Sequence, residues 1–206
     1  MTATIEDILS AAIGFTNTGQ QAAARMLCEH AMASHPAHPA VLQLLALLDL
    51  QQGNVARAKH HAAASLALRA DHVPTLLIAS DVARAAGELH EALRLLERVV
   101  MQVPTLANAW FQIALIRQDL ADLRGAAVAL HEVLRIEPAR ADAEVNLGIV
   151  LQEIGQLEAA MQAYGRAYRL REATFGRIAH ALATPNVGRL WLNLDDLRRA
   201  LRQTGA

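Results

Sequence analysis

The sequence predicts an all-α protein built from repeated helical hairpins, and two observations support this fold class. Hydrophobic residues make up 53% of the chain but aromatic residues only 3%, so alanine and leucine must supply most of the packing. That composition favours closely packed helices over sheets, which prefer β-branched and aromatic side chains. The second observation is a period, because Gly19, Gly53 and Gly87 are spaced by 34 residues and Gly155 lies two periods further on.

Other positions keep the same period. Ala121 stands where the series lacks a glycine, and proline recurs near the end of three units, at Pro36, Pro104 and Pro138. An alanine follows the turn position by five residues in every unit: Ala24, Ala58, Ala92, Ala126 and Ala160. A fixed period of this length is the signature of a repeat architecture. The units predicted without any insertion are 5–38, 39–72, 73–106, 107–140 and 141–174.

One unit, 107–140, shows how each repeat is expected to fold. Trp110, Ile113 and Ala114 lie on one face at helical spacing, and a second amphipathic helix is predicted over 123–136. The small residue between the helices permits a tight turn, and the periodic alanine lets the two helix backbones approach closely. Pro138 ends the second helix because proline lacks the N–H that would continue it.

The chain resembles the tetratricopeptide repeat family over residues 5–174. The unit 141–174 carries the family pattern best, at Leu147, Gly148, Gly155, Ala160, Tyr164 and Ala167. The aromatic residue expected at the start of a repeat is present only as Trp110, whereas the other units have Ile8, Leu42, Leu76 and Glu144. The resemblance implies a right-handed superhelical solenoid of five hairpins, since each hairpin must stack on its neighbours to bury its apolar face.

The residues after the fifth repeat are expected to cover its open side. Phe175, Ile178 and Leu182 recur at helical spacing and predict a capping helix over 175–183. Residues 184–206 are interpreted as a turn followed by an amphipathic tail with a stripe of Leu190, Leu194, Leu197 and Leu201. Two hypotheses remain open for this tail. It either packs in a groove, its own or that of a second copy through residues 189–202, or it extends the cap along the fifth repeat.

The resemblance also implies that the first helix of each hairpin lines a concave groove where partners bind. The groove positions carried over to this sequence are mostly apolar: Leu9, Ile13, Gln43, Leu47, Leu77, Asp81, Arg84, Phe111, Leu115, Gln118, Val145, Ile149 and Gln152. The basic clamp with which some family members hold a terminal carboxylate is absent, and the asparagine ladder of others is reduced to Asn146. An apolar trough favours a helix-in-groove mode, in which a partner docks an apolar or amphipathic segment.

No catalytic, metal or cofactor site is predicted. Cys28 is the only cysteine and is expected to be a buried structural thiol; His30, His35 and His38 lack the spacing of a metal site. A net charge of −1 argues against nucleic acid, and no segment is long and apolar enough for a membrane span.

The function expected is therefore a non-catalytic, cytoplasmic protein-interaction adaptor. The alternatives are a scaffold that associates through its tail, and an accessory module of a separately encoded transferase or hydroxylase.

Overall fold

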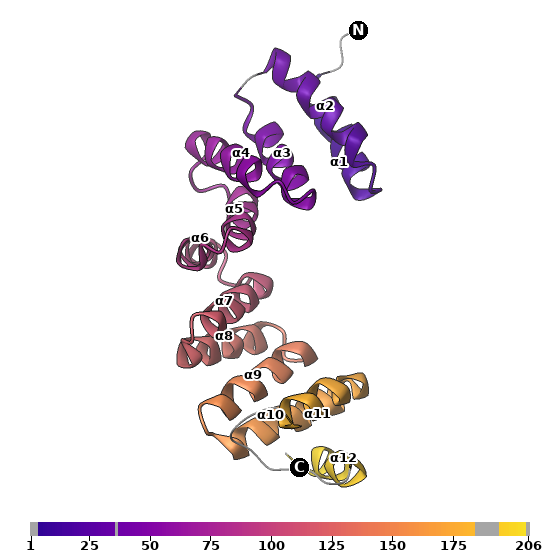
Figure 1. Ribbon diagram of the computed structural model, residues 1–206, viewed down its shortest axis with the longest axis vertical. Helices are drawn as coiled ribbons and strands as arrows, with labels where there is room; N and C mark the ends of the chain where they lie inside the picture. The colour runs from indigo at the N-terminus through magenta and orange to yellow at the C-terminus, as the bar shows by residue number, and fades with distance from the viewer. Residues whose placement is uncertain (1–3, 36, 184–193, 205–206) are drawn as a thin grey trace. The chain divides into compact units, whose positions relative to one another are not determined.

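The computed structural model describes residues 4–35, 37–183 and 194–204, and every regular element in these ranges is helical. The chain forms two compact units, Met1–Gln102 and Val103–Ala206. The first unit holds three hairpins, labelled in Figure 1: α1 (Ile5–Asn17) with α2 (Gln21–Ser34), α3 (Pro39–Gln51) with α4 (Val55–Leu68), and α5 (Val73–Ala85) with α6 (Leu89–Gln102).

The second unit continues the same pattern and adds helices at its end. Its hairpins are α7 (Ala107–Asp119) with α8 (Leu123–Ile136), and α9 (Ala141–Glu153) with α10 (Leu157–Leu170). A short 3₁₀ turn, η1 (Glu172–Thr174), leads into α11 (Phe175–Ala183), and α12 (Leu194–Gln203) follows. The helices pack in consecutive pairs, which confirms the predicted all-α fold of helical hairpins.

The turn inside each hairpin depends on one residue in the left-handed region of backbone space. Gly19, Gly53, Gly87 and Gly155 have φ between 75° and 89°, and Ala121 takes the same conformation with φ 59°. A side chain in this region brings Cβ too close to the following carbonyl oxygen, at a cost of about 1–2 kcal/mol. The turn of the fourth hairpin therefore carries strain that the other four avoid.

Replacing Ala121 by glycine is expected to stabilise the second unit by about 1 kcal/mol, because relief of the strain outweighs the greater entropy of glycine in the unfolded chain. Urea denaturation followed by circular dichroism measures this. The reverse change, Gly87→Ala, is the matched control: an added Cβ there meets no atom within 4 Å, so only the backbone conformation penalises it. If Ala121→Gly and Gly87→Ala changed the free energy of unfolding equally and in the same direction, this explanation would be contradicted.

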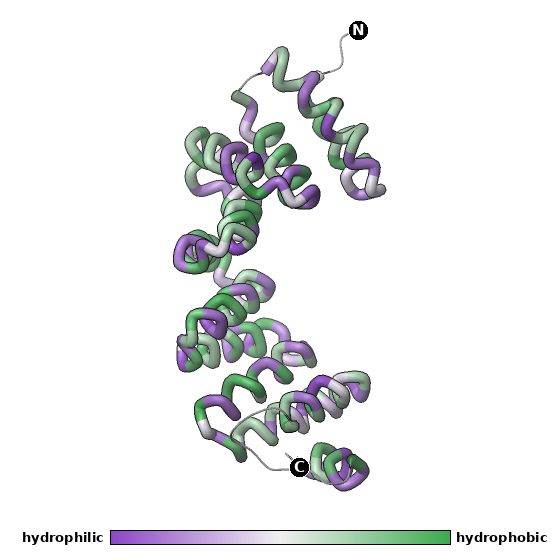
Figure 2. Tube along the Cα trace, viewed as in Figure 1, coloured by the Kyte–Doolittle hydropathy of each residue, from purple (hydrophilic) through white to green (hydrophobic). Residues whose placement is uncertain are grey.

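The core of the first unit contains a buried carboxylate. The helix α3 is hydrophobic along most of its length (Figure 2), yet Asp49 on it is 0% exposed. Arg25 of α2 donates a hydrogen bond from Nη2 to Asp49 Oδ1 at 2.6 Å, and His61 Nδ1 of α4 lies 2.8 Å from Oδ2. The carboxylate thus links the first hairpin to the second across three helices.

The core of the fifth hairpin is built around Tyr164. Its side chain is 0% exposed, and its hydroxyl donates to Gln152 Oε1 at 2.8 Å. The ring fits because the facing residue on α9 is Gly148, where an added Cβ would lie 2.4 Å from a ring carbon. In the fourth hairpin, the corresponding positions hold Ala114 and Leu130, both fully buried. A larger residue on the second helix therefore goes with a smaller one on the first.

The tail helix α12 lies on the fifth hairpin. It packs against α10 and α11, and Leu197 and Leu201 are buried there. The backbone of α12 approaches α10 at Gly165, where an added Cβ would lie 3.0 Å from the carbonyl oxygen of Leu201. Arg169 of α10 donates from Nη1 to the carbonyl oxygens of Leu201 and Thr204, near the C-terminal end of α12.

This position bears on the hypotheses for the tail in residues 194–204, and docking of the tail on a second copy stays a prediction. Docking of the tail in a groove of first helices within its own chain is wrong for these residues, because they lie on α10 and α11. In these residues the tail instead extends the cap along the fifth hairpin. The basic side of α12 is held by aromatic rings, since Arg198 stacks over Phe175 with its guanidinium carbon 4.3 Å from the ring centroid. Leu190 and the turn over 184–188 lie outside the described residues.

Candidate functional site on the first helices

The first helices of the first unit present apolar side chains that the core only partly covers. We call the side of α1, α3 and α5 that carries Leu9, Ile13, Leu47 and Leu77 the first-helix face of this unit. Leu9, Leu47 and Leu77 are half-buried, and Ile13 is 49% exposed. The three helices are neighbours, since α3 contacts both α1 and α5. A partner could therefore meet apolar groups from adjacent hairpins on this face.

The polar residues of this face are tied into the structure. Gln43 accepts a hydrogen bond at its Oε1 from the Thr75 hydroxyl at 3.3 Å, which links α3 to α5. Asp81 lies 3.9 Å from Arg84, and partial burial raises the pKa of its carboxyl above the ordinary value while Arg84 opposes this shift. Burial that disfavours the ionised form makes this carboxylate costly to cover further without a new donor.

In the second unit, Phe111 of α7 forms an anchor beside a polar pocket. The guanidinium of Arg140, from the turn between α8 and α9, stacks over the Phe111 ring at 4.4 Å. The adjoining open pocket of about 460 Å³ is lined by Asn108, Glu137, Pro138, Ala139 and Arg140.

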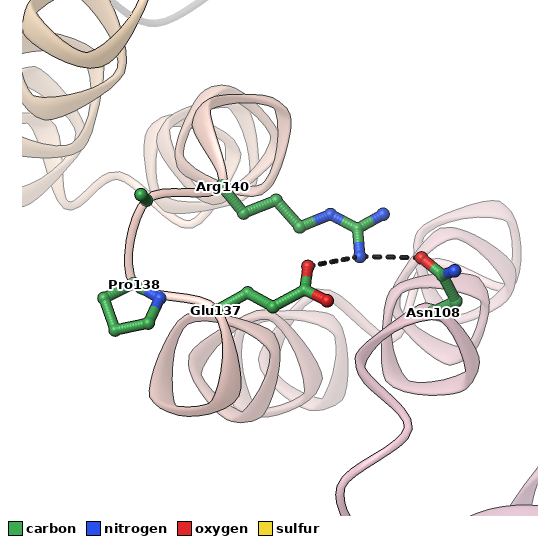
Figure 3. A pocket seen from close by; sticks show the side chains of 5 residues that line it. Asn108, Glu137, Pro138 and Arg140 are labelled. Atoms are coloured by element: carbon green, nitrogen blue, oxygen red, sulfur yellow. Dashed lines mark hydrogen bonds and ion pairs between the residues drawn. The ribbon is translucent and has the colours of Figure 1, made fainter.

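Figure 3 shows how Arg140 lines this pocket. Its side chain reaches between Glu137 and Asn108, and Nη1 donates to Asn108 Oδ1 at 2.8 Å and to Glu137 Oε2 at 3.1 Å. Nε donates to Asp142 Oδ1 at 3.1 Å. These bonds hold the guanidinium plane on Phe111, so the pocket has a rigid polar rim beside an apolar ring.

The fifth hairpin differs from the others because α11 covers part of its first helix. Val145 and Gln152 of α9 are 0% and 2% exposed, whereas Ile149 between them is half-buried. Gln152 Nε2 donates to the carbonyl oxygen of Ala181 on α11 at 3.3 Å. Val145 and Gln152, predicted as groove residues, are therefore not accessible to a partner, and α11 contributes to the burial of Gln152. Leu115 and Gln118 of α7 remain half-buried.

The residues considered for chemistry are placed apart from one another. Cys28 is 1% exposed, and burial raises the pKa of its thiol to about 11, so the reactive thiolate is scarce at neutral pH. His61 is engaged with Asp49, and His60 and His30 are exposed on different helices. Within the described ranges, no three histidine, cysteine or acidic side chains come together as a metal site. None of the helices described is both long and apolar enough to cross a membrane.

Comparison with known proteins identifies the repeat. A tetratricopeptide repeat model matches residues 141–174. The fold is similar to the crystal structure of a MamA protein, with a TM-score of 0.73 at 16% identity over 81% of this chain and 91% of that one. It is also similar to a MamA RS-1 double mutant, with a TM-score of 0.75 at 17% identity over 81% and 94% of the two chains. No curated protein sequence matches this one.

Consecutive helical hairpins with partly uncovered apolar first helices define a repeat protein of the protein-interaction class. Residues 141–174 are the repeat that the tetratricopeptide model matches. The solved structures share its fold at identities of 20% or below, so they say nothing about its partner.

Proposed function

We propose that this protein is a non-catalytic adaptor that binds an amphipathic helix of a partner protein on the first-helix faces. Each unit would bind by itself, through Leu9, Ile13, Leu47 and Leu77 in the first unit and through Phe111 and Leu115 in the second. The five units predicted over 5–174 would each supply one first helix. The buried free thiol Cys28 agrees with a reducing, cytoplasmic setting.

One observation carries this proposal: the structure already contains an amphipathic helix docked on a first helix. The helix α11 contacts α9, and its apolar residue Ile178 is 0% exposed. Polar groups of α9 fix the docked helix in place through the bonds to Ala181 and Arg177. A first helix of this repeat is thus suited to hold a helix on its exposed side.

The apolar groups supply a substantial part of the binding free energy. Four anchors of leucine or phenylalanine size contribute about 1.5–3 kcal/mol each when buried, before the costs of association and ordering. A net affinity in the micromolar range corresponds to about 8 kcal/mol, so polar contacts beside the apolar anchors must add to what these anchors supply. The first-helix face of the first unit offers four such anchors by itself.

Site-specific photo-crosslinking tests the proposal. A benzophenone amino acid is placed at Ile13 or Leu115 on the first helices, and the protein is irradiated in cells of its source organism. The matched controls carry the same group at Met26 of α2 and Val128 of α8, which are 71% and 59% exposed on the second helices of the same hairpins. We expect discrete adducts from the first-helix positions and none from the controls.

The adducts also report the chemistry of the partner. Mass spectrometry of digested adducts is expected to place the crosslink in a segment with apolar residues at i, i+3 or i+4, and i+7. A synthetic peptide of that segment should bind the purified protein, and Leu47→Asp should weaken binding at least tenfold. Equal labelling from Met26 and Val128, or a peptide indifferent to Leu47→Asp, would show that partners use another surface.

A further inference from the structure

The covered face of α9 has the features of a recognition site and not only of a core. Asn146 and Gln152 are 7% and 2% exposed, and both amides point to α11. Arg177 of α11 donates from Nη2 to Asn146 Oδ1 at 3.0 Å. Purely structural contact between two apolar helices needs no buried amides, because burying a polar group is unfavourable unless it finds a partner.

Gln152 recognises the end of the docked helix. Since α11 ends at Ala183, the carbonyl of Ala181 is among the last four, which have no partner inside the helix. Gln152 Nε2 supplies the donor for this carbonyl, and the Tyr164 hydroxyl holds the other end of the amide at 2.8 Å. The amide is thereby oriented to receive a helix C-terminus.

Few buried side chains attach α11 to the fifth hairpin. Ile178 is its only fully buried side chain, and the helix has nine residues, so it has little stability on its own. Its N-terminal residue Phe175 is covered by Arg198 of α12, which is anchored on α10 by Leu197 and Leu201. The tail helix α12 thus helps to hold α11 on the fifth hairpin.

We propose that the α9 face of the fifth hairpin is a docking site for the C-terminal end of a partner's amphipathic helix, and that α11 is its resident, displaceable occupant. The helix that fits carries an arginine directly before a buried aliphatic residue, as Arg177 precedes Ile178, and ends over Gln152. This inference rests on the proposed function and extends it to the fifth hairpin. A partner that engages this site must displace α11.

A synthetic peptide of residues 172–183 with a fluorescent label is the probe, and fluorescence anisotropy with the full chain is the measurement. In the wild-type chain the site is filled. If α11 is docked for more than about nine-tenths of the time, the apparent Kd is raised at least about tenfold. Ile178→Asp in the chain expels the resident helix, and we expect this variant to bind the peptide at least tenfold more tightly than wild type. Val128→Asp, at a site 59% exposed on α8, is the matched control and should not differ from wild type.

A double-mutant cycle tests the recognition itself. Asn146→Leu in the Ile178→Asp chain is expected to weaken the peptide about tenfold or more, the usual effect of losing a hydrogen bond to a charged group. A peptide with Arg177→Ala should lose the same factor, and the two changes together should lose no more than either one.

Cooperative thermal unfolding shows whether the Ile178→Asp variant folds. If it does not, releasing α12 from α11 is a second way to empty the site. The double variant Leu197→Asp and Leu201→Asp should release α12, speed hydrogen exchange in α11 and raise peptide affinity. Equal peptide affinity of wild-type and emptied chains, or binding indifferent to Asn146→Leu, would overturn the inference. Neither result changes the crosslinks expected from Ile13 and Leu115. Failure of the α9 docking site is therefore distinguishable from failure of the proposed function.

Discussion

Replacing Asp49 by alanine is expected to lower the free energy of unfolding of the first unit by about 3–5 kcal/mol. The carboxylate is fully buried, and its removal leaves Arg25 and His61 without their common partner. Their side chains are only 15% and 16% exposed, so water replaces the lost bonds poorly. Urea denaturation of the wild type and the variant measures the difference.

The control for this prediction is Asp71→Ala. Asp71 pairs with Arg98 at a similar distance, 2.7 Å, but its side chain is 74% exposed. Exposed ion pairs contribute at most about 1 kcal/mol, so this change should be nearly neutral. A second variant replaces Arg25, Asp49 and His61 together by apolar residues of similar volume, and it should recover most of the lost stability. If Asp49→Ala and Asp71→Ala cost the same, burial is not the cause.

The substitution Gly148→Ala is expected to destabilise the second unit by about 1–3 kcal/mol, although alanine is the better helix former by about 1 kcal/mol. The added methyl would lie 2.4 Å from the Tyr164 ring, which is fully enclosed and held by its bond to Gln152. The ring cannot move aside without breaking that bond. Thermal and urea unfolding of the variant give the cost.

Leucine at position 164 should rescue this variant. The fourth hairpin combines Ala114 with Leu130 at the corresponding sites, so Gly148→Ala with Tyr164→Leu recreates a pair that this fold already uses. We expect a coupling energy of about 1–2 kcal/mol between the two sites in a double-mutant cycle. Additive effects would mean that the methyl and the ring do not meet.

The fold class could be predicted because its signals are local and repeated. Each unit repeats a glycine or Ala121 at the turn and an alanine five residues later, and the structure has the corresponding helical hairpins. Repeated copies of a weak pattern reinforce one another, since each repeat contacts only its neighbours. The apolar character of the first helices followed from the same register.

The exposure of the candidate site residues could not be read from that register. Val145 and Leu77 occupy the same place in their repeats and look alike in sequence, but only Val145 is fully buried. The role of Asp49 was also missed. An acid at the end of an apolar run is a sign of a special environment, but the sequence does not show that Arg25 and His61 lie within reach.

The sequence by itself therefore determined the helices, their pairing into hairpins and the side that each first helix leaves apolar, because these depend on spacing along the chain. Only the tertiary structure decided where the C-terminal helices lie. The amphipathic patterns of α11 and α12 suit any apolar surface, and the choice depends on particular contacts. Gly165 admits the backbone of α12, Arg169 binds the carbonyls at its end, and Gln152 binds the end of α11. These contacts join residues about 30 positions apart, and no repeat period encodes them.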